Sequence, residues 1–487
     1  MTAVTRRGIL KRMSSLAGLI LAKTVYGKNV PANATDVYRE RYRPQFHYTV
    51  KKGWINDPCG LVHYAGEYHL FNDHNPFGNV IPGALGDKNR PPSRWSHAVS
   101  RDLVHWQEMP VAILPDKLGA IFSGSGVVDG ADTAGFGKGD DKTLVLVYTS
   151  AGEPFSQSIS YSNDRGRTWT RYEGNPVVPN QGLTATERDP RVFRHEPTKK
   201  WVMVLYVKRG VARFFTSDDL KHWTHASDLT GRDFHECPDM FELPLDGDKT
   251  KTKWILHDAP FNYSVGTFDG KTFTPEAGPF RGDFGGNFYA AQTWTHTPGR
   301  RIQIAWMRGG RYPGMPFNQQ MSFPCELRLV TGPEGPRLYR YPVKEIAALH
   351  SGKGLVVTDK RLKVGDNPLA GVSGDLFDIE MAVRPGRAGE FGLRMHGQAV
   401  TWTQDEISCL GRSASLSPVK GVVTLRILLD RTSLEVFAND GEVSMTSCVL
   451  PARPETPLEL YAKGAEAHLE SLTVHRLRSA WDRPAAR

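Results

Sequence analysis

The chain is poor in cysteine, and the cysteines that it has form no pattern. There are five in 487 residues, an odd number, and none of them belongs to a CxxC pair or a zinc-ligand spacing. We therefore expect buried thiols rather than a disulfide framework, no metal site and no cofactor. The positions are Cys59, Cys237, Cys325, Cys409 and Cys448.

Long apolar runs are missing as well, so no membrane-spanning helix is expected. The mildly apolar run SSLAGLILA (14–22) is too short to span a bilayer, and it follows TRRGILK (5–11), which resembles a twin-arginine signal. The tripeptide ANA (32–34) fits a small-x-small cleavage site. We expect residues 1–34 to be a removable export signal and the mature protein to be periplasmic or extracellular, with no membrane attachment. A basic amphipathic N-terminal helix is the alternative, and Pro31 argues against it.

Acidic residues are absent from the first 30 residues, which hold six lysines and arginines. The formal charge of the whole chain is +9, so the remainder carries only +3. Its lysines and arginines are interleaved with acidic residues and form no dense basic patch. Nucleic-acid binding is therefore not expected.

The first two thirds of the chain consist of short runs rich in Val, Ile, Tyr, Phe and Trp, broken by Gly, Pro, Asn and Asp. This texture indicates strands rather than helices. A polar turn followed by an aromatic residue recurs in it, and repetition of strands at about 50 to 65 residues is typical of propeller blades. The turns are SRDLVHW (100–106), SNDRGRTWT (162–170), SDDLKHWT (217–224) and, more weakly, FDGKTFT (268–274).

A second set of similar phrases lies out of phase with these turns, at the start of each unit. Because there are five of them, we expect residues 40–345 to form a five-bladed β-propeller. The first strand of each blade lines the central channel, so polar residues at its mouth come together from different blades. The phrases are NDPCGLVHY (56–64), FSGSGVVD (122–129), RDPRVFRH (188–195), ECPDMFEL (236–243) and NFYAAQTW (287–294).

Three acids stand at equivalent places in these phrases: Asp57, Asp189 and Glu236. Taken singly, each is explained at least as well by turn chemistry, because Asp-Pro is common in turns and an acid before a strand is usually solvated. Taken together, with Arg188 directly before Asp189, they predict one acidic site at the axis of the propeller.

The texture changes after residue 345, where aromatic residues become fewer and short runs alternate apolar and polar residues. The Asn-Asp-Gly sequence at 439–441 is a strong hairpin signal. We expect residues 355–480 to form a β-sandwich, joined to the propeller through 331–355. The predicted fold class is therefore all-β, with two domains.

Acids around a pocket suit the hydrolysis of a glycosidic bond. An ionised carboxylate attacks the anomeric carbon, and a protonated carboxyl gives its proton to the departing oxygen. Glu236 has apolar neighbours in the sequence, so we expect it to hold the proton, and Asp57 is then the nucleophile. Asp189, beside Arg188, should stay ionised and stabilise charge that grows on the sugar ring.

Four phrases, WINDPCG, FSGS, ERDPRVF and HECPDMFEL, resemble the ordered motif set of glycoside hydrolase family 32. This family comprises the β-fructofuranosidases, including invertases, inulinases and levanases. Further similarity, for example in MSFPCELRL and SLEVFANDGEVSMTS, extends over most of residues 42–478. The resemblance implies a five-bladed propeller followed by a β-sandwich. It also implies an exo-acting enzyme that releases fructose from levan, inulin, fructo-oligosaccharides or sucrose.

By the same resemblance, Asp57 is the nucleophile, Glu236 the acid/base and Asp189 the transition-state stabiliser. Configuration is then retained through a fructosyl-enzyme intermediate, and the carboxyl groups of Asp57 and Glu236 should lie about 5 to 5.5 Å apart. The resemblance also implies residues that bind the terminal fructose or supply aromatic walls, with blade packing an equal alternative for the two tryptophans. They are Asn56, Phe122, Ser123, Arg188, Trp95 and Trp306.

The sequence departs from the family pattern inside this predicted site. The family has Gln in a FYQYNP phrase, whereas FNDHNP (71–76) places Asp73 there. Asp73 is a further candidate for substrate binding, because its carboxyl would raise the pKa of a neighbouring acid or change which glycosyl unit is accepted. A plain structural role is the alternative. Cys59 and Ser96 replace Asn and Gly in two other motifs, and none of these changes removes a predicted catalytic acid.

Two other functions are compatible with three converging acids. One is a propeller glycosidase of another specificity, such as a family 43-like arabinan or xylan hydrolase, which the phrases FSGS and EVFAND disfavour. The other is a carbohydrate-binding protein without catalysis, which has no need of all three acids. Linkage preference, exo or endo action, transfructosylation and oligomeric state stay open at this point.

Overall fold

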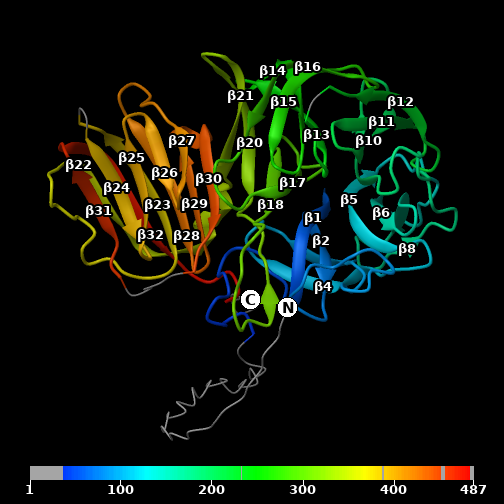
Figure 1. Ribbon diagram of the computed structural model, residues 1–487, viewed down its shortest axis with the longest axis horizontal. Helices are drawn as coiled ribbons and strands as arrows, with labels where there is room; N and C mark the ends of the chain where they lie inside the picture. The colour runs from blue at the N-terminus through cyan, green and yellow to red at the C-terminus, as the bar shows by residue number, and fades with distance from the viewer. Residues whose placement is uncertain (1–36, 232, 387–388, 451–455, 483–487) are drawn as a thin grey trace, which may run out of the picture. The chain divides into compact units, whose positions relative to one another are not determined.

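The computed structural model describes residues 37–231, 233–386, 389–450 and 456–482, and nearly all regular structure in them is β-strand (Figure 1). The helices in these ranges are two short 3₁₀ segments, η1 (Lys344–Leu349) and η2 (Asn439–Gly441). The predicted all-β fold class is confirmed. In the same ranges no helix is both long and apolar enough to cross a membrane.

The strands before η1 pair mainly with their neighbours in the sequence and form antiparallel groups of four. They are β1 (Gly53–Tyr64), β2 (Glu67–Asn75), β3 (Arg94–Ser100), β4 (Trp106–Ile113), β5 (Ala120–Asp129), β6 (Thr143–Ala151), β7 (Ser156–Ser162), β8 (Thr170–Arg171), β9 (Arg188–His195), β10 (Lys200–Lys208), β11 (Val211–Ser217), β12 (Thr224–Leu229), β13 (Asp239–Leu245), β14 (Asp248–His257), β15 (Asn262–Phe268), β16 (Phe273–Arg281), β17 (Tyr289–Thr293), β18 (Ile302–Trp306), β19 (Phe317–Asn318), β20 (Cys325–Gly332) and β21 (Gly335–Pro342).

Three groups, β1–β4, β5–β8 and β9–β12, are separate sheets, and the first also takes β19 as a parallel edge strand. The remaining strands form the groups β13–β16 and β17, β18, β20 and β21, joined into one sheet through the single pair Leu245 and Leu329. The inner strands are neighbours: β1 lies beside β5 and β17, β5 beside β9, and β13 beside β17. This arrangement is that of a β-propeller, and the count of five blades stays our interpretation of the strand groups.

The two sets of repeated phrases occupy equivalent places in these groups. The five opening phrases lie on β1, β5, β9 and β17 and at the start of β13. Each polar turn joins the third strand of a group to the fourth, and its aspartate accepts hydrogen bonds from the backbone N–H groups that follow. Asp102 accepts from His105 (2.8 Å), and Asp219 accepts from His222 (2.8 Å). Because aspartate satisfies turn donors in this way, the sequence repeat marks a structural repeat.

The strands from β22 onward form two further sheets. They are β22 (His350–Leu362), β23 (Phe377–Arg384), β24 (Glu390–Met395), β25 (Gln398–Thr403), β26 (Glu406–Cys409), β27 (Arg412–Ser415), β28 (Val423–Asp430), β29 (Ser433–Ala438), β30 (Val443–Cys448), β31 (Glu459–Lys463) and β32 (Ala467–Leu477).

One of these sheets has the order β22-β32-β23-β28-β29-β30 and the other β27-β26-β25-β24-β31. Their apolar side chains share one buried core, which includes Ile379, Leu393 and Val436, as expected for a β-sandwich. The predicted turn at 439–441 joins β29 to β30. It also packs against β21, because a Cβ atom on Gly441 would lie 2.2 Å from the carbonyl oxygen of Arg340.

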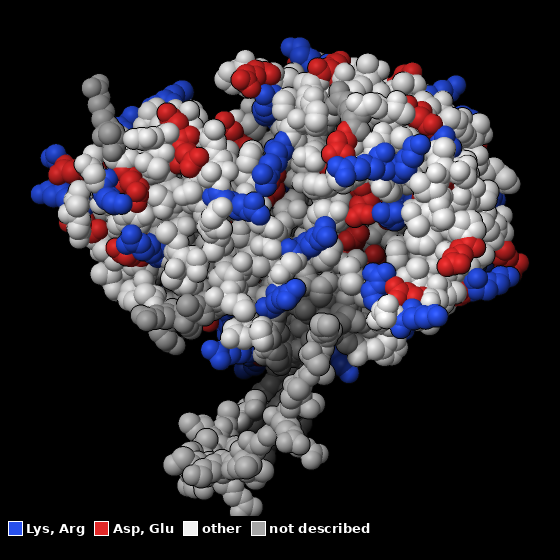
Figure 2. Space-filling model, viewed as in Figure 1, with Lys and Arg blue, Asp and Glu red and all other residues white. Residues whose placement is uncertain are grey.

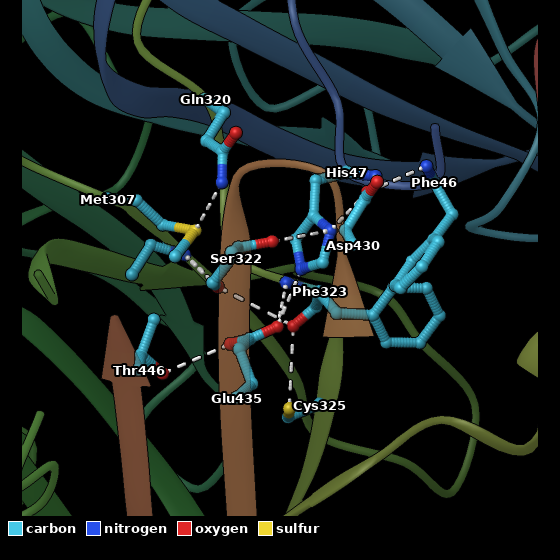
Figure 3. Close-up of polar contacts among 12 residues, drawn as sticks. Phe46, His47, Met307, Gln320, Ser322, Phe323, Cys325, Asp430, Glu435 and Thr446 are labelled. Carbon is cyan, nitrogen blue, oxygen red and sulfur yellow. Dashed lines mark hydrogen bonds and ion pairs between the residues drawn. The ribbon is translucent and has the colours of Figure 1, made fainter. Parts of the chain in front are cut away.

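A buried polar cluster connects the segment before β1 to the sandwich (Figure 3). The imidazole of His47 lies between two carboxylates, with Nδ1 2.8 Å from Asp430 Oδ2 and Nε2 2.8 Å from Glu435 Oε2. All three side chains are 0% exposed. Asp430 also accepts hydrogen bonds from the backbone N–H groups of Gln45 (2.7 Å) and Phe46 (3.0 Å). These contacts, called the His47 cluster below, attach the propeller's entry segment to β28 and β29.

The first and last described segments of the chain also meet. The ring of Tyr38 stacks on that of Trp481, with centroids 4.1 Å apart and planes 13° apart. The indole Nε1–H of Trp481 donates to the carbonyl of Pro44 (2.8 Å), and the backbone N–H of Ala480 donates to that of Gln45 (2.7 Å). The segment before β1 is therefore packed against the segment after β32.

Candidate active site

Three acids that are far apart in the sequence lie around one site. Asp57 is on β1, Asp189 is on β9, and Glu236 lies three residues before β13. The thiol of Cys237 connects the two aspartates, with its Sγ 3.3 Å from Asp57 Oδ2 and 3.5 Å from Asp189 Oδ2. Arg188 connects the other pair, with Nη2 2.6 Å from Glu236 Oε2 and Nε 3.7 Å from Asp189 Oδ2. The structure thus brings the three predicted acids together.

Irregular backbone aims these side chains. The register between β1 and β2 shifts between Ile55 and Pro58, so Asp57 lies in an irregular part of its strand. Asp189 lies where the pairing of β9 with β10 shifts, and its φ is 64°, in the left-handed region. Cys237 has a φ of 53°. Strand irregularities of this kind re-aim side chains, and left-handed backbone at a non-glycine residue is concentrated at functional sites.

Asp57 is held by uncharged donors. The hydroxyl of Ser123 donates to its Oδ2 (2.7 Å), and the amide of Asn56 donates to its Oδ1 (3.4 Å). No cation forms an ion pair with Asp57 within the described ranges. Burial, together with the charge of Glu236, raises the pKa of Asp57 against the effect of these hydrogen bonds.

Glu236 has a charged partner and a neutral one. Its Oε2 pairs with Arg188, and its Oε1 accepts a hydrogen bond from the hydroxyl of Tyr289 (2.8 Å). The Glu236 side chain is 31% exposed and that of Asp189 is 4% exposed, so Glu236 is the more accessible of the two. Such a position suits a group that exchanges protons with substrate and water.

The distribution of charge differs from our expectation that Arg188 keeps Asp189 ionised while Glu236 holds a proton. Burial raises the pKa of Asp189 to about 7, although Arg188 opposes the shift. Burial also acts to raise the pKa of Glu236, but the hydrogen bond and charge of Arg188 outweigh it, so that pKa is lowered. The reason is geometry: Arg188 hydrogen-bonds to Glu236 at 2.6 Å, whereas its contact with Asp189 is an ion pair of 3.7 Å. In the free site, therefore, Glu236 is ionised.

Comparison with known families accounts for both domains. The model of the glycosyl hydrolases family 32 N-terminal domain matches residues 47–342, and that of the family 32 C-terminal domain matches residues 345–476. The chain belongs to glycoside hydrolase family 32. The resemblance identified in the sequence is thereby confirmed, and with it the propeller followed by a sandwich.

Individual relatives agree with this assignment. A levanase of Bacillus subtilis (strain 168) is 41% identical over 507 residues, covering 92% of this chain and 73% of the relative. An extracellular exo-inulinase of Aspergillus niger is 31% identical, covering 96% of this chain and all of the relative. The crystal structure of an exo-inulinase from Aspergillus awamori superposes with a TM-score of 0.82 at 30% identity, covering 91% of this chain and 100% of that one. Neither alternative function, the arabinan or xylan hydrolase or the non-catalytic binder, is favoured by these matches.

Several residues with predicted sugar contacts do line this family 32 site. Asn56, Ser123 and Arg188 each contact at least one of the three acids. Phe122 packs edge-on against Phe155, with ring centroids 5.5 Å apart, and it remains partly exposed. Their roles toward sugar stay predictions.

The aromatic walls are a different matter. Trp95 is 0% exposed, and its Nε1–H donates to Asp73 Oδ1 (3.1 Å), so the prediction that its face lines the sugar pocket is wrong and the packing alternative holds. Trp306 is also buried, and its ring lies edge-on to Trp54 and Tyr289 with centroids 6.3 and 6.1 Å away. Its Nε1–H donates to the side chain of Gln319 (2.8 Å), which fixes the ring as part of the packing.

Three contributors were not predicted from the sequence. Cys237 bridges the aspartates, Tyr289 donates to Glu236, and Trp54 orients Asn56 by donating from Nε1 to its Oδ1 (3.2 Å). Each lies in one of the repeated or family-like phrases of the sequence, but its contact depends on the direction of its side chain, which those phrases do not encode. In the described part of the chain no group of three or more His, Cys, Asp or Glu side chains is arranged to hold a metal ion.

The visible face in Figure 2 carries lysine and arginine side chains interspersed with acidic ones. No broad area of a single charge is visible there. Acidity is concentrated instead at the site, where Asp57, Asp73, Asp189 and Glu236 lie close enough for their charges to affect one another. Arg188 is the cation paired with two of these acids.

Proposed function

We propose that this chain is a retaining β-fructofuranosidase that releases fructose from levan- or inulin-type fructans, fructo-oligosaccharides or sucrose. The observation that carries the proposal is the meeting of Asp57, Asp189 and Glu236 at one site in a chain of family 32. Relatives named levanase and exo-inulinase support this substrate class.

In the first half of the reaction, Asp57 attacks the anomeric carbon of a terminal fructose. The bond from that carbon to the glycosidic oxygen breaks, and Glu236 gives the departing oxygen a proton, which leaves a fructosyl ester on Asp57. In the second half, water attacks the same carbon and Glu236 takes a proton from it, so free fructose leaves with its configuration retained. Ser123 and Asn56, which hydrogen-bond to Asp57, keep its carboxylate oriented for attack.

Arg188 links substrate binding to the proton on Glu236. While the ion pair of 2.6 Å is intact, Glu236 is ionised and has no proton to give. Sugar hydroxyl groups that take up the donors of the guanidinium weaken its hold on Glu236. The pKa of Glu236 then rises toward that of a general acid, because the remaining burial favours the neutral form.

Asp189 is assigned to the developing positive charge on the sugar ring. It accepts a hydrogen bond from the backbone N–H of Cys237 (3.1 Å), which fixes the carboxylate beside Asp57. Burial raises the pKa of Asp189 to about 7, so a nearby positive charge readily shifts Asp189 to its ionised form. The positive charge that grows on the sugar ring has this effect, and the ionised carboxylate then stabilises that charge.

The remaining expectations complete the proposal. Residues 40–345 form a five-bladed propeller, and residues 355–480 form a sandwich. The molecule that the protein binds is a fructan, a fructo-oligosaccharide or sucrose. Binding to nucleic acid or to a membrane is not part of the proposal. The export signal at 1–34 and its twin-arginine stretch lie outside the described residues. Relatives named extracellular support an exported protein, and N-terminal sequencing of secreted material tests the cleavage.

Product analysis on levan, inulin and sucrose side by side tests the activity. We expect fructose as the released product, with β-configuration at the moment of release as followed by NMR. A ladder of oligosaccharides would show that the enzyme cleaves inside the polymer rather than at its end. Failure to release fructose or oligosaccharides from any of the three substrates would refute the proposal.

A further inference from the structure

Asp73 is an acid beneath the site with a contact pattern of its own. It lies on β2, opposite Trp95 of β3, and is 5% exposed, so little of it can reach a substrate. Three polar groups contact its carboxyl. Trp95 Nε1 lies 3.1 Å from Oδ1, and Asn56 Nδ2 and Ser123 Oγ lie 3.2 and 3.3 Å from Oδ2. Two of these neighbours, Asn56 and Ser123, also contact Asp57. Asp73 and Asp57 are therefore joined through shared partners.

The serine hydroxyl cannot serve both acids. A hydroxyl has one proton to donate and accepts through its lone pairs. Ser123 Oγ is 2.7 Å from Asp57 Oδ2 and 3.3 Å from Asp73 Oδ2, so the shorter contact takes the proton. The contact with Asp73 is then a hydrogen bond only if Asp73 itself is the donor, which requires a neutral carboxyl.

The other two contacts place that proton on one oxygen. An indole Nε1–H only donates, so Trp95 gives Asp73 Oδ1 a hydrogen bond but cannot accept one from a proton on that oxygen. The amide of Asn56 is fixed in orientation because its Oδ1 accepts from Trp54, so its Nδ2 faces Asp73 as a donor. Asp73 Oδ2 accepts this bond through a lone pair and has its proton free for Ser123.

The charged surroundings favour the same state. The titratable groups that face Asp73 are Asp57 and Cys59 from β1 and Asp189 from β9, and β3 and β5 present the uncharged Trp95 and Ser123. None of the ion pairs in the described ranges includes Asp73. Burial, together with the charges of Asp57 and Asp189, raises the pKa of Asp73 well above its usual range.

We propose that Asp73 is a positioning residue that keeps a proton in the folded enzyme, so that its O–H turns the hydroxyl of Ser123 toward Asp57 and leaves Asp57 as the ionised member of the pair. The inference rests on the proposed nucleophilic role of Asp57. When Asp73 loses its proton, both Asp57 and Asp73 need the single proton of the Ser123 hydroxyl, and a second negative charge lies beside the nucleophile. Activity is then expected to fall on the alkaline side as Asp73 ionises.

The decisive test needs no substrate. Asp73→Asn is matched in shape, cannot ionise, and still offers an N–H to Ser123 and a carbonyl to Trp95. In unfolded chains Asp73 ionises near pH ~3.9, whereas the folded enzyme keeps its proton. Unfolding therefore releases a proton, and the stability of the wild type falls as pH rises above ~4. Urea unfolding at pH 5, 6 and 7 should show the wild-type folding constant falling about tenfold per pH unit relative to the variant.

A ratio of folding constants that stays level across this range would overturn the proposal, because it means that folded Asp73 is ionised. Asp73→Gln serves as a second neutral variant if Asn does not fold. In enzyme assays, Asp73→Asn should keep at least about a tenth of kcat/KM, with its alkaline limb at higher pH than that of the wild type. A loss as large as that of Asp57→Asn, or an unmoved alkaline limb, would contradict the positioning role. Failure of the wild type to release fructose would instead count against the proposed function.

Discussion

The protein contains two buried groups of acids that differ in how their charge is balanced. At the site, Asp189 and Glu236 share the cation Arg188, and Asp57 has no paired cation among the described residues. In the His47 cluster, each carboxylate has its own imidazole nitrogen at 2.8 Å. Figure 3 shows His47 between its two partners, with Ser322, Phe323 and Thr446 close by.

The difference extends to the pKa values. In the His47 cluster, burial acts to lower the pKa of His47, but hydrogen bonds to Asp430 and Glu435 outweigh it and raise that pKa to about 9. The pKa values of both carboxyls are lowered in turn, against the effect of burial. At the site, by contrast, the pKa values of Asp57 and Asp189 are raised. Carboxylates that are each paired with a ring nitrogen of His47 attach the segment before β1 to the sandwich, whereas incompletely paired carboxyls at the site keep raised pKa values that suit proton chemistry.

Replacing an acid of the site sharpens this contrast most. Asp57→Asn and Glu236→Gln should each lower kcat/KM on levan by about 10³-fold or more, because each removes a group that reacts. Urea unfolding should show Asp57→Asn to be as stable as the wild type or more stable, because a buried carboxyl with a raised pKa loses its charge. Glu236→Gln should lose up to about 1 kcal/mol, because it loses the charge of its partly exposed ion pair with Arg188. A stability loss of several kcal/mol, or activity kept in either variant, would remove the distinction between the two groups.

Replacing His47 tests the other group. His47→Ala leaves Asp430 and Glu435 buried without their cation, and the expected loss is about 3 to 5 kcal/mol in the free energy of unfolding. His105→Ala is the matched control, because His105 also pairs with an aspartate (2.7 Å) but is 31% exposed, and its loss should be below about 1 kcal/mol. Equal losses in the two variants would show that the buried cluster has no special role.

The pH dependence of stability separates the clusters further. The pKa of folded His47 is about 9 and that of an unfolded histidine about 6.5, so its contribution is complete below pH ~6.5 and is lost as pH rises through 9. The wild type should lose about 3 kcal/mol of this contribution over that interval. His47→Gln should lack this decline in urea unfolding between pH 6.5 and 9.5. Parallel curves for the two proteins would mean that His47 is neutral in the folded state.

The smallest expected effect concerns the neutral partner of Glu236. Tyr289→Phe removes one hydrogen bond of 2.8 Å and should reduce kcat/KM by about two- to tenfold, which corresponds to ~0.5 to 1.5 kcal/mol. The pKa of Glu236 should rise slightly, because the bond favours its ionised form. Tyr263→Phe is the control, because the Tyr263 hydroxyl accepts a hydrogen bond from the backbone N–H of Leu338 on β21 (3.0 Å), and it should leave the pH–rate profile unchanged. An identical profile for Tyr289→Phe would place Tyr289 outside the catalytic network.

The fold could be predicted from the sequence because the features that indicate it, the strand texture and the turns, involve residues close together in the chain. The polar turn around Asp102 and the one around Asp219 repeat since every group must close its third and fourth strands in the same way. Likewise, Asp57 and Asp189 stand at the same point of equivalent strands, so their meeting followed from the repeat. Periodicity and turn chemistry were sufficient for these predictions.

Contacts that depend on side-chain direction were beyond the sequence. Arg188 adjoins Asp189 in the chain but pairs more closely with Glu236, because an irregular strand turns it there. Trp95 was as compatible with a sugar platform as with packing, and only its burial decided between them. His47 and Asp430 are 383 residues apart, and nothing in either local sequence indicates the other.

The stacking of Tyr38 on Trp481 has a consequence for engineering. Two positions near opposite ends of the described part of the chain already touch, so a short linker that joins them in place of residues 1–37 and 482–487 would introduce little strain. New termini could then be opened at an exposed loop, giving a circularly permuted enzyme whose two domains are connected twice along the backbone.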